Sequence, residues 1–355
     1  MKSLTVAITG MNARADNPGP GLAVARCLRE EERFQGNIIG LSYDALDPGL
    51  YLEEMCEASF LLPYPSAGET ALLQRMQEIH ADTPFDVLIP CLDAELLSMV
   101  HLKDAFAAMG IKMLLPDSEQ LEYRNKDKLP QLGQDIDIKI PELKNITHAG
   151  FFYQCTQEGW HYPLVVKGLF YDAAVVHSAD EAAAAFHKIA ASWGLPVLVQ
   201  RFIEGEEVNL STVGDGQGNM LAPVSMRKRA LTDKNKAWAG MTVDDPKVVE
   251  AAEKIIRHIK WPGPLEVEMM IGRDGHYYLI EINPRFPAWI YLSKAVGCNL
   301  PYILLELITG NTPEATQTPK AGSMFIRYAQ EVVISLSDFE QMTMYGHYKG
   351  EKDHD

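Results

Sequence analysis

The run LEVEMMIGRDGHYYLIEINPRF at residues 265–286 constrains the fold of this chain more than any other segment. Two apolar stretches flank GRDG at 272–275, a sequence typical of turns, so the run predicts a strand–turn–strand hairpin. Side chains alternate between the two faces of a strand. We therefore expect Glu281, Asn283 and Arg285 to lie on one face of the second strand.

The first strand of this hairpin carries two more acids, Glu266 and Glu268, which share a face for the same reason. Carboxylate and amide oxygens suit a hard cation such as Mg²⁺, which commonly bridges nucleotide phosphates. An arginine beside them offers a forked donor for a phosphoryl oxygen or a carboxylate. The alternative is a surface hairpin with a structural salt bridge. The apolar residues around the acids favour buried strands, where an acid needs a partner.

The pattern ExE…EINPR resembles the metal-binding signature of the ATP-grasp superfamily, and especially its carbamoyl-phosphate-synthetase and biotin-carboxylase branch. The resemblance implies ATP and Mg²⁺ as cofactors, with Mn²⁺ as an alternative cation. It implies that Glu268, Glu281 and Asn283 hold the metal and that Arg285 contacts the transferred phosphate or the acyl phosphate. It assigns no role to Glu266.

Other segments match the ATP-grasp order along the chain. Lys128 resembles the first ATP lysine, with Lys126 as its rival. Lys167, at the end of the apolar stretch PLVVKG, resembles the second. QRFIEGEE at 200–207 resembles the hinge that reads adenine, and the alternative is an ordinary strand and turn with exposed acids. The hinge residues expected to bind the nucleotide are Gln200, Arg201, Phe202 and Ile203, with Glu207 on the ribose.

Lys167 is followed by GLFYDAAVVHS, which contains one glycine. Many family members have a glycine-rich loop here, because backbone N–H groups that cradle phosphates usually need glycine. We therefore expect either a tight hairpin with fewer backbone contacts or a lid that uses side chains. Tyr171 and His177 are the candidate side chains, and a packed aromatic and a surface histidine are the alternatives.

Three cations interrupt an apolar stretch in MRKR at 226–229. Alternation places Arg227 and Arg229 on one face and Lys228 on the other. The two arginines are candidate catalytic residues that could hold the γ-phosphate or an acceptor carboxylate. The alternative is that they pair with the many acids of this chain.

Strands alternate with helices up to about residue 120, which predicts a parallel sheet. The fold class is therefore α/β, and the resemblance implies a doubly wound N-terminal domain followed by an ATP-grasp fold with two α+β subdomains that clasp ATP. The expected strands at 4–10, 37–44 and 111–116 fit this class, as do a strand that runs into a helix over 86–97 and a helix that starts at about Gly21. The expected domains are a Rossmann-like domain at 1–120, a lid subdomain at 121–198, a metal-binding subdomain at 199–330 and a partly flexible extension at 331–355.

Asp93 and Glu95 follow the third expected strand, where open α/β sheets place ligands. Capping of a helix N-terminus is the alternative. Family members often use this domain for the acceptor pocket. Trp289 and Tyr291, after the metal motif, could floor such a pocket beside Arg285, and their alternative is the core.

A net charge of −16 argues against a general nucleic-acid binder and against an anionic membrane surface. No run approaches the length of a membrane span. The five scattered cysteines form no CxxC pair, and an odd number fits a reducing cytoplasm. By resemblance alone, we expect a homodimer.

We expect an ATP-dependent carboxylate–amine ligase whose carboxylate and amine substrates are small molecules or peptides. This chemistry needs positioning and charge neutralisation, and no protein nucleophile. One alternative is an enzyme that phosphorylates bicarbonate for carboxylation or carbamoylation. The other is a non-catalytic nucleotide-binding protein with the same fold.

Overall fold

The computed structural model describes residues 4–169 and 172–350, and the chain divides into two compact units. Unit 1 comprises Met1–Leu121, Leu210–Glu266 and Asn283–Asp355, and unit 2 comprises Glu122–Asn209 and Val267–Ile282. Some strands therefore run from one unit into the other along the chain; they are β9 (Gly205–Asp215), β12 (Pro262–Gly272) and β13 (Tyr277–Asn283).

The N-terminal part of unit 1 is built on a sheet with strand order β15-β3-β2-β1-β4. The strands from β3 to β4 are parallel, and β15 is an antiparallel edge strand. Its strands are β1 (Thr5–Ile8), β2 (Asn37–Ser42), β3 (Ala58–Leu61), β4 (Val87–Ile89) and β15 (His347–Tyr348). The connecting helices are α1 (Gly21–Arg29), α2 (Glu69–Asp82), α3 (Asp93–His101), α4 (Lys103–Ala108) and α5 (Ser118–Glu122).

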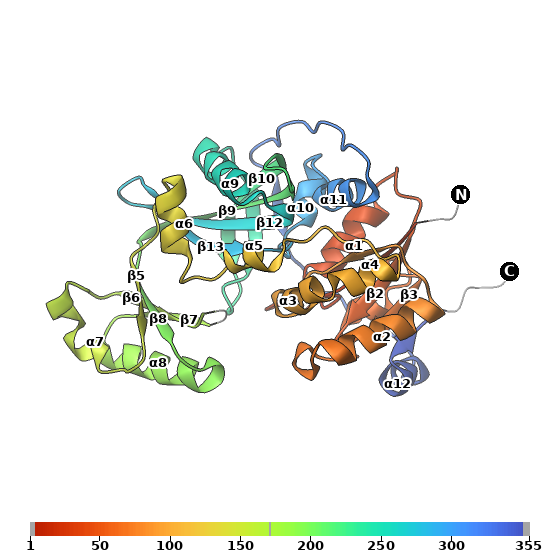
Figure 1. Ribbon diagram of the computed structural model, residues 1–355, viewed down its shortest axis with the longest axis horizontal. Helices are drawn as coiled ribbons and strands as arrows, with labels where there is room; N and C mark the ends of the chain where they lie inside the picture. The colour runs from red at the N-terminus through yellow and green to blue at the C-terminus, as the bar shows by residue number, and fades with distance from the viewer. Residues whose placement is uncertain (1–3, 170–171, 351–355) are drawn as a thin grey trace. The chain divides into compact units, whose positions relative to one another are not determined.

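Helices cover both faces of this parallel sheet (Figure 1). Along β1, Val6 and Ile8 pack in one hydrophobic cluster with Val24 of α1, whereas Ala7 packs in another with Leu72 of α2. This alternation is what a strand buried on two faces requires. The expected doubly wound N-terminal domain is confirmed.

The remainder of unit 1 contains a helical layer and part of a second sheet, whose strand order is β13-β12-β9-β10-β11-β14. Its other strands are β10 (Met220–Leu231), β11 (Ala237–Thr242) and β14 (Met324–Ile326). The helices are α9 (Pro246–Ile259), α10 (Tyr291–Ala295), α11 (Leu300–Thr309) and α12 (Leu336–Tyr345).

Unit 2 contains an antiparallel sheet of order β5-β8-β6-β7. The strands are β5 (Leu143–Ile146), β6 (Leu164–Lys167), β7 (Ala173–Val176) and β8 (Val197–Arg201). Its helices are α6 (Leu129–Ile136), α7 (Phe151–Gln154) and α8 (Ala179–Trp193). Helices α7 and α8 lie along one face of the sheet (Figure 1), and Phe152, Phe186 and Val199 share its core. Ser178 caps α8, because its side chain accepts a hydrogen bond from Glu181 N.

One expected strand is wrong. The segment 111–116 forms no strand beyond one parallel bridge from Lys112 to Val87. Further along the chain, α5 ends at Glu122 and α6 begins at Leu129. Near the C-terminus, β15 pairs with β3.

All five cysteine thiols are buried and free. Among the residues described, no helix combines the length and the apolar character needed to cross a lipid bilayer.

Candidate functional site

Unit 2 brings two buried lysines to the acids of the hairpin. Lys126 Nζ lies 3.0 Å from Glu281 Oε1, and the Lys126 side chain is 9% exposed. Lys167, at the end of β6, is 3% exposed and close enough to Lys126, Glu281 and Glu268 to feel their charges. Lysine is rarely buried without a partner. The four side chains therefore form a compact, charge-balanced cluster, called here the lysine–acid cluster.

The environment of Lys167 lowers its pKa to about 8. Burial is the largest cause, because it penalises the charged form, and the nearby Lys126 adds to it. Glu281 and Glu268 act in the opposite direction and favour the ammonium form. An anion such as phosphate beside Lys167 would relieve the repulsion between the two lysines.

The two candidates for the first lysine lie in different surroundings. The Lys128 side chain is 54% exposed, and its Nζ lies 4.0 Å from the exposed Glu122. The buried Lys126 instead points to Glu281. The exposed ion pair of Lys128 with Glu122 contributes little to stability. The structure therefore favours Lys126, the rival in the sequence, over Lys128.

The expected hinge begins in β8, which contains Gln200 and Arg201, and continues through Phe202 and Ile203. The Arg201 side chain is already engaged, since its Nε lies 2.6 Å from Glu142 Oε2 and its guanidinium stacks 4.9 Å from the Trp160 ring centroid. It therefore leaves only backbone groups for a nucleotide. Phe202 and Ile203 are half-buried and offer apolar surface, and Glu207 is half-buried too.

Gly205 allows close approach of the hinge to β12. A Cβ at this position would lie 1.9 Å from the Ile271 carbonyl oxygen, so only glycine fits without backbone movement. The segment 200–207 is thus fixed by packing as well as by the β8 pairing.

Lys167 ends β6, which pairs with the following strand β7, and the form of the loop between them stays a prediction because residues 170–171 lie outside the described residues. Gly168 N donates to Asp172 O, and β6 pairs with β7 in antiparallel register. Tyr171 lies outside the described residues. His177 is exposed, and its backbone N–H donates to Glu181 Oε2, so it serves the start of α8.

Unit 1 holds a second charged cluster, centred on the buried Glu266, called here the Glu266 network. Arg285 Nη1 and Asn283 Nδ2 donate to Glu266 Oε2 over 2.9 and 3.1 Å. Trp289 Nε1 donates to Glu266 Oε1 over 2.9 Å. Arg285 Nε also donates to Asp93 Oδ2 over 2.9 Å. Asn283 and Arg285 thus meet at one carboxylate, although β13 ends at Asn283.

Two carboxylates hold Arg285 in its charged form. Burial alone would lower the pKa of the guanidinium, but Asp93 and Glu266 outweigh it, so the pKa is raised. The Arg285 side chain is 15% exposed. Within the described residues, no hydrogen bond occupies Nη2. Arg285 is therefore a preset donor with one nitrogen free for an anion.

The two acids after β4 have different tasks. Glu95 is buried, and it accepts hydrogen bonds from Thr9 Oγ1, Tyr43 OH and the backbone N–H groups of Cys91 and Leu92. Burial raises its pKa. Glu95 therefore caps the N-terminus of α3, which is the alternative to a ligand-binding role, and it also links the ends of neighbouring strands. Asp93 instead reaches Arg285, a partner that sequence separation conceals.

The aromatic candidates are both engaged. Trp289 belongs to the unit 1 core while its indole N–H reaches Glu266. Tyr291 donates to Glu30 Oε2, and Arg26 stacks on its ring at 3.8 Å. Tyr291 is therefore structural, and Trp289 is a core residue that also supports the Glu266 network.

The MRKR arginines do not form a regular pair. The β10–β11 register shifts between Lys228 and Ala230, so Arg229 lies in a bulge and strict alternation fails there. Arg227 Nη2 lies 3.7 Å from Asp245 Oδ2, and Arg229 is exposed. Pairing with an acid, the alternative, is thus observed for Arg227.

The donor set fits Mg²⁺ by its chemistry. Glu268 and Glu281 supply carboxylates, and Asn283 supplies an amide whose Nδ2 is bound to Glu266, which turns Oδ1 away from that acid. No three His, Cys, Asp or Glu side chains converge as a metal site within 4–169 and 172–350. The chemistry of these donors, two carboxylates in unit 2 and one amide in unit 1, fits a hard cation.

Unsatisfied buried polar atoms give a second test of fit. Gln200 Nε2, both amide atoms of Asn209 and Ser211 Oγ are buried and have no hydrogen-bond partner in the described part of the chain. Buried polar atoms are nearly always satisfied by protein, water or ligand. Residues along β8 and β9 therefore fit a polar ligand or its bound water.

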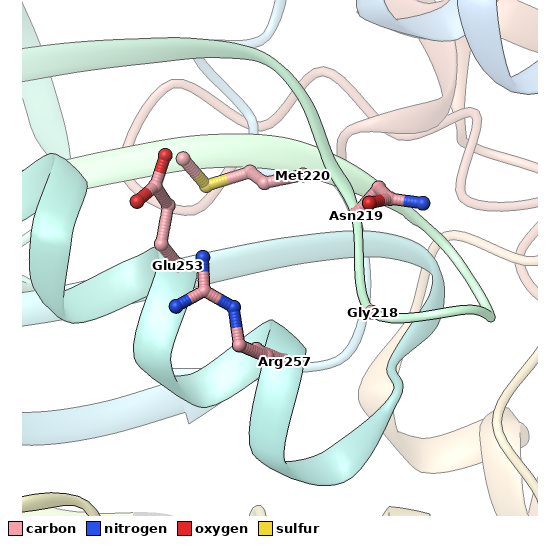
Figure 2. Close-up of a pocket in the computed structure, with 5 residues that line it drawn as sticks. All are labelled: Gly218, Asn219, Met220, Glu253 and Arg257. Atoms are coloured by element: carbon pink, nitrogen blue, oxygen red, sulfur yellow. The ribbon is translucent and has the colours of Figure 1, made fainter.

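A surface hollow elsewhere in unit 1 is a poor candidate. Figure 2 shows Glu253 and Arg257 of α9 beside Gly218 and Asn219 and beside Met220, the first residue of β10. The volume of this hollow, about 200 Å³, is small for a ligand site, since such sites usually span about 300–1,000 Å³.

Residues 195–332 match the sequence profile of a family described as ATP-grasp in the biosynthetic pathway with Ter operon. The arginine-specific large chain of carbamoyl phosphate synthase from Geobacillus stearothermophilus is 24% identical over 212 residues, which cover 55% of this chain and 19% of the relative. This chain thus spans about a fifth of that relative's length.

Solved structures extend the likeness to most of the chain. The L-amino acid ligase from Bacillus licheniformis superposes with a TM-score of 0.64 at 19% identity, covering 87% of this chain and 74% of the ligase. The biotin carboxylase domain of 2-oxoglutarate carboxylase from Hydrogenobacter thermophilus, solved with MgADP, ADP and bicarbonate, has a TM-score of 0.69 at 13% identity, covering 90% and 73%. The chain therefore contains an ATP-grasp domain, related to that of carbamoyl phosphate synthase and with the fold of biotin carboxylase.

Proposed function

We propose that this chain is an ATP-dependent carboxylate–amine ligase that forms a C–N bond and releases ADP and phosphate. The observation that carries the proposal is the lysine–acid cluster, in which Lys126 and Lys167 are buried beside Glu268 and Glu281. Two cations and two carboxylates gathered in this way are costly in a protein interior without a ligand to serve. Phosphate groups and a divalent cation supply the complementary charges.

The residues divide the work of binding the nucleotide. Lys126 and Lys167 hold phosphate oxygens, and Glu268, Glu281 and Asn283 hold Mg²⁺. The backbone from Gln200 to Ile203 reads adenine, and Glu207 holds the ribose. When bound, Mg²⁺ neutralises the phosphate oxygens and draws them into a fixed geometry.

The reaction then proceeds by transfer of the γ-phosphoryl group to a substrate carboxylate. This step breaks the bond between the β,γ-bridging oxygen and the γ-phosphorus and leaves ADP. The amine attacks the carbonyl carbon of the acyl phosphate, phosphate leaves, and the amine loses one proton. Arg285 is a donor held by Asp93 and Glu266, and it offers Nη2 to the charge that develops on the transferred group.

The relatives favour an amino acid, a peptide or a related small metabolite as the acceptor. One structural relative is an L-amino acid ligase, and the matched family is described as biosynthetic. The bicarbonate found with the H. thermophilus carboxylase supports the second candidate, a bicarbonate-phosphorylating enzyme. A homodimer in a reducing cytoplasm stays a prediction for either candidate.

The experiment is to measure ADP release from Mg-ATP against separate pools of amino acids, dipeptides, small carboxylic acids and bicarbonate. We expect one organic pool to stimulate release and to yield a product with a new C–N bond, detected by mass spectrometry. Glu281→Gln is the blank, because it removes one metal-binding carboxylate at nearly constant volume.

The outcomes separate the candidates. Stimulation by bicarbonate alone would favour the carboxylase or carbamoyl-phosphate class. Tight Mg-ATP binding with no stimulation by any pool would contradict the small-molecule ligase and favour the non-catalytic alternative.

A further inference from the structure

Glu266 accepts hydrogen bonds from three different side chains, although the family pattern assigns it no role. Its Oε2 accepts from Arg285 Nη1 and Asn283 Nδ2, and its Oε1 accepts from Trp289 Nε1. Glu266 is 4% exposed, so these bonds form away from bulk water. Charge-assisted bonds in such surroundings are stronger than neutral ones.

Both oxygens of Glu266 are engaged, so its carboxylate is fixed in orientation. Trp289 is a rigid core side chain that anchors Oε1, and this leaves Oε2 aimed at Asn283 and Arg285. Only an acceptor fits that place, because both neighbours present N–H groups. Glu266 is therefore built to select one orientation of each neighbour.

For Asn283, the bond to Glu266 decides which end of the amide faces which way. Nδ2 donates to the carboxylate, and so Oδ1 turns away from it. An amide rotated by 180° would place oxygen against oxygen and would be repelled. The oxygen is the only amide atom that can bind a cation.

For Arg285, Glu266 acts together with Asp93. Bonds from Nη1 and Nε to the two carboxylates fix the plane of the guanidinium. A planar fork held at two nitrogens points the third in a set direction, and little rotamer entropy is left to lose when an anion binds.

We propose that Glu266 is a positioning residue that orients the Asn283 amide for a divalent cation and the Arg285 guanidinium for a phosphoryl group, without touching either ligand itself. This inference rests on the proposed function, because it concerns the same nucleotide site. It adds a residue whose loss uncouples metal from nucleotide while the binding residues stay in place.

The test compares Glu266→Gln with the matched change Glu253→Gln on an exposed site of α9. Glutamine keeps the size of Glu266, but it places an N–H group against one of the three donors and removes the charge. Calorimetry gives the ATP affinity with and without Mg²⁺ for each variant. We expect the Mg²⁺-dependent gain in ATP affinity to fall about 10-fold to 100-fold in Glu266→Gln and to be unchanged in Glu253→Gln.

A spectroscopic readout shows whether the network itself has changed. The indole N–H signal of Trp289 is assigned among the five tryptophans by Trp289→Phe, and it should shift in Glu266→Gln. Trp289→Phe removes one donor and leaves Asn283 and Arg285 bound to Glu266. Its Mg²⁺ dependence should therefore fall less than that of Glu266→Gln, because both bonds to Oε2 remain.

A shifted indole signal in folded Glu266→Gln with undiminished Mg²⁺ dependence would overturn the inference. If Glu266→Gln does not fold, Glu266→Asp decides. Glu266→Asp retains the charge beside Arg285, but its side chain is one methylene too short to hold all three donors. The Mg²⁺-dependent gain in ATP affinity should therefore be lost in this variant. An undiminished gain in folded Glu266→Asp would overturn the inference. Failure of the proposed function looks different, namely normal Mg²⁺-coupled ATP binding with no ADP release for any acceptor.

Discussion

The two units each gather charged side chains around part of the same hairpin, but they stabilise them in different ways. In the lysine–acid cluster of unit 2, the links are ion pairs and longer-range electrostatic interactions, such as Lys126 with Glu281 and Lys167 with both acids. In the Glu266 network of unit 1, every link is a hydrogen bond of 2.9–3.1 Å from a planar donor group, and the two from Arg285 are ion pairs as well. A lysine ammonium on a flexible stem tolerates movement, whereas a planar guanidinium, amide or indole is fixed in direction by its hydrogen bonds.

The difference suggests that the charged groups of the lysine–acid cluster exchange partners when a ligand binds, whereas those of the Glu266 network keep theirs. Lys126 and Glu281 neutralise one another here, and each can transfer to a phosphate or a metal of opposite charge. Arg285 and Asn283 are held by a residue that keeps hold of them when a ligand arrives. The following predictions test that division, from the largest effect to the smallest.

Glu281→Gln and Asn283→Ala change one residue from each cluster. Both should reduce ADP formation on the order of 10²–10³-fold, because each removes a ligand of the cation that neutralises the transferred phosphate. Steady-state ADP release is the measurement, and circular dichroism checks that the variants fold. Wild-type turnover in either variant would refute the metal assignment of that residue.

Arg285→Ala should reduce turnover by about 10²-fold while the dissociation constant of ATP changes by less than about threefold, because Arg285 acts on the transferred group. Titration calorimetry and turnover are measured on the same preparation. Equal loss of binding and turnover would instead indicate an arginine that only supports the structure.

Lys126→Met should weaken ATP binding by about tenfold or more, the usual loss for one charged hydrogen-bond donor, whereas Lys128→Met should change it by less than about twofold. The two variants form a matched pair only two residues apart. The reverse order of effects would restore Lys128 as the first nucleotide lysine.

ATP affinity should decline as pH rises through about 8, because Lys167 has a pKa of about 8 and binds phosphate best when protonated. ATP binding above this pH should take up a proton, which calorimetry in buffers of different ionisation enthalpy detects. Lys167→Met should remove this component. A pH-independent affinity between 7 and 9 in the unmodified chain would contradict the prediction.

The lowered pKa of Lys167 also predicts how the free energy of unfolding depends on pH. Between about pH 8 and the ordinary lysine value of 10.5, the unfolded chain binds more protons at this residue than the folded chain. The Lys167 contribution to the free energy of unfolding should therefore increase with pH across that interval. Urea unfolding of the unmodified chain and of Lys167→Met at pH 8 and pH 10 compares the two slopes.

Much of the fold follows from local patterns. The hairpin at 265–286 forms where its apolar alternation and GRDG turn predict it, and α8 lies between the N-cap Ser178 and the C-cap Gly194. The segment 111–116 was a wrong prediction, because an apolar run followed by a proline resembles a strand whether or not it finds a partner. Only Lys112 does so.

Pairing across long sequence distances was harder to foresee. Nothing near Asp93 indicates that it reaches Arg285, which lies 192 residues further along the chain. The choice between Lys126 and Lys128 likewise depends on which side chain is buried. Glu266 was visible as an acid on the same face as Glu268, but its three donors come from residues 17 to 23 positions away.

The bond from Asp93 to Arg285 bears on how such proteins can be recombined. Asp93 follows a strand of the N-terminal sheet, so that sheet contributes one of the two carboxylates that aim the arginine. Exchange of residues 1–121 for the corresponding domain of a relative would leave the arginine tethered on one side unless the donor supplies an acid at this place. A chimaera could then fold and retain nucleotide while losing phosphoryl transfer, and restoring that one carboxylate is the first repair to attempt.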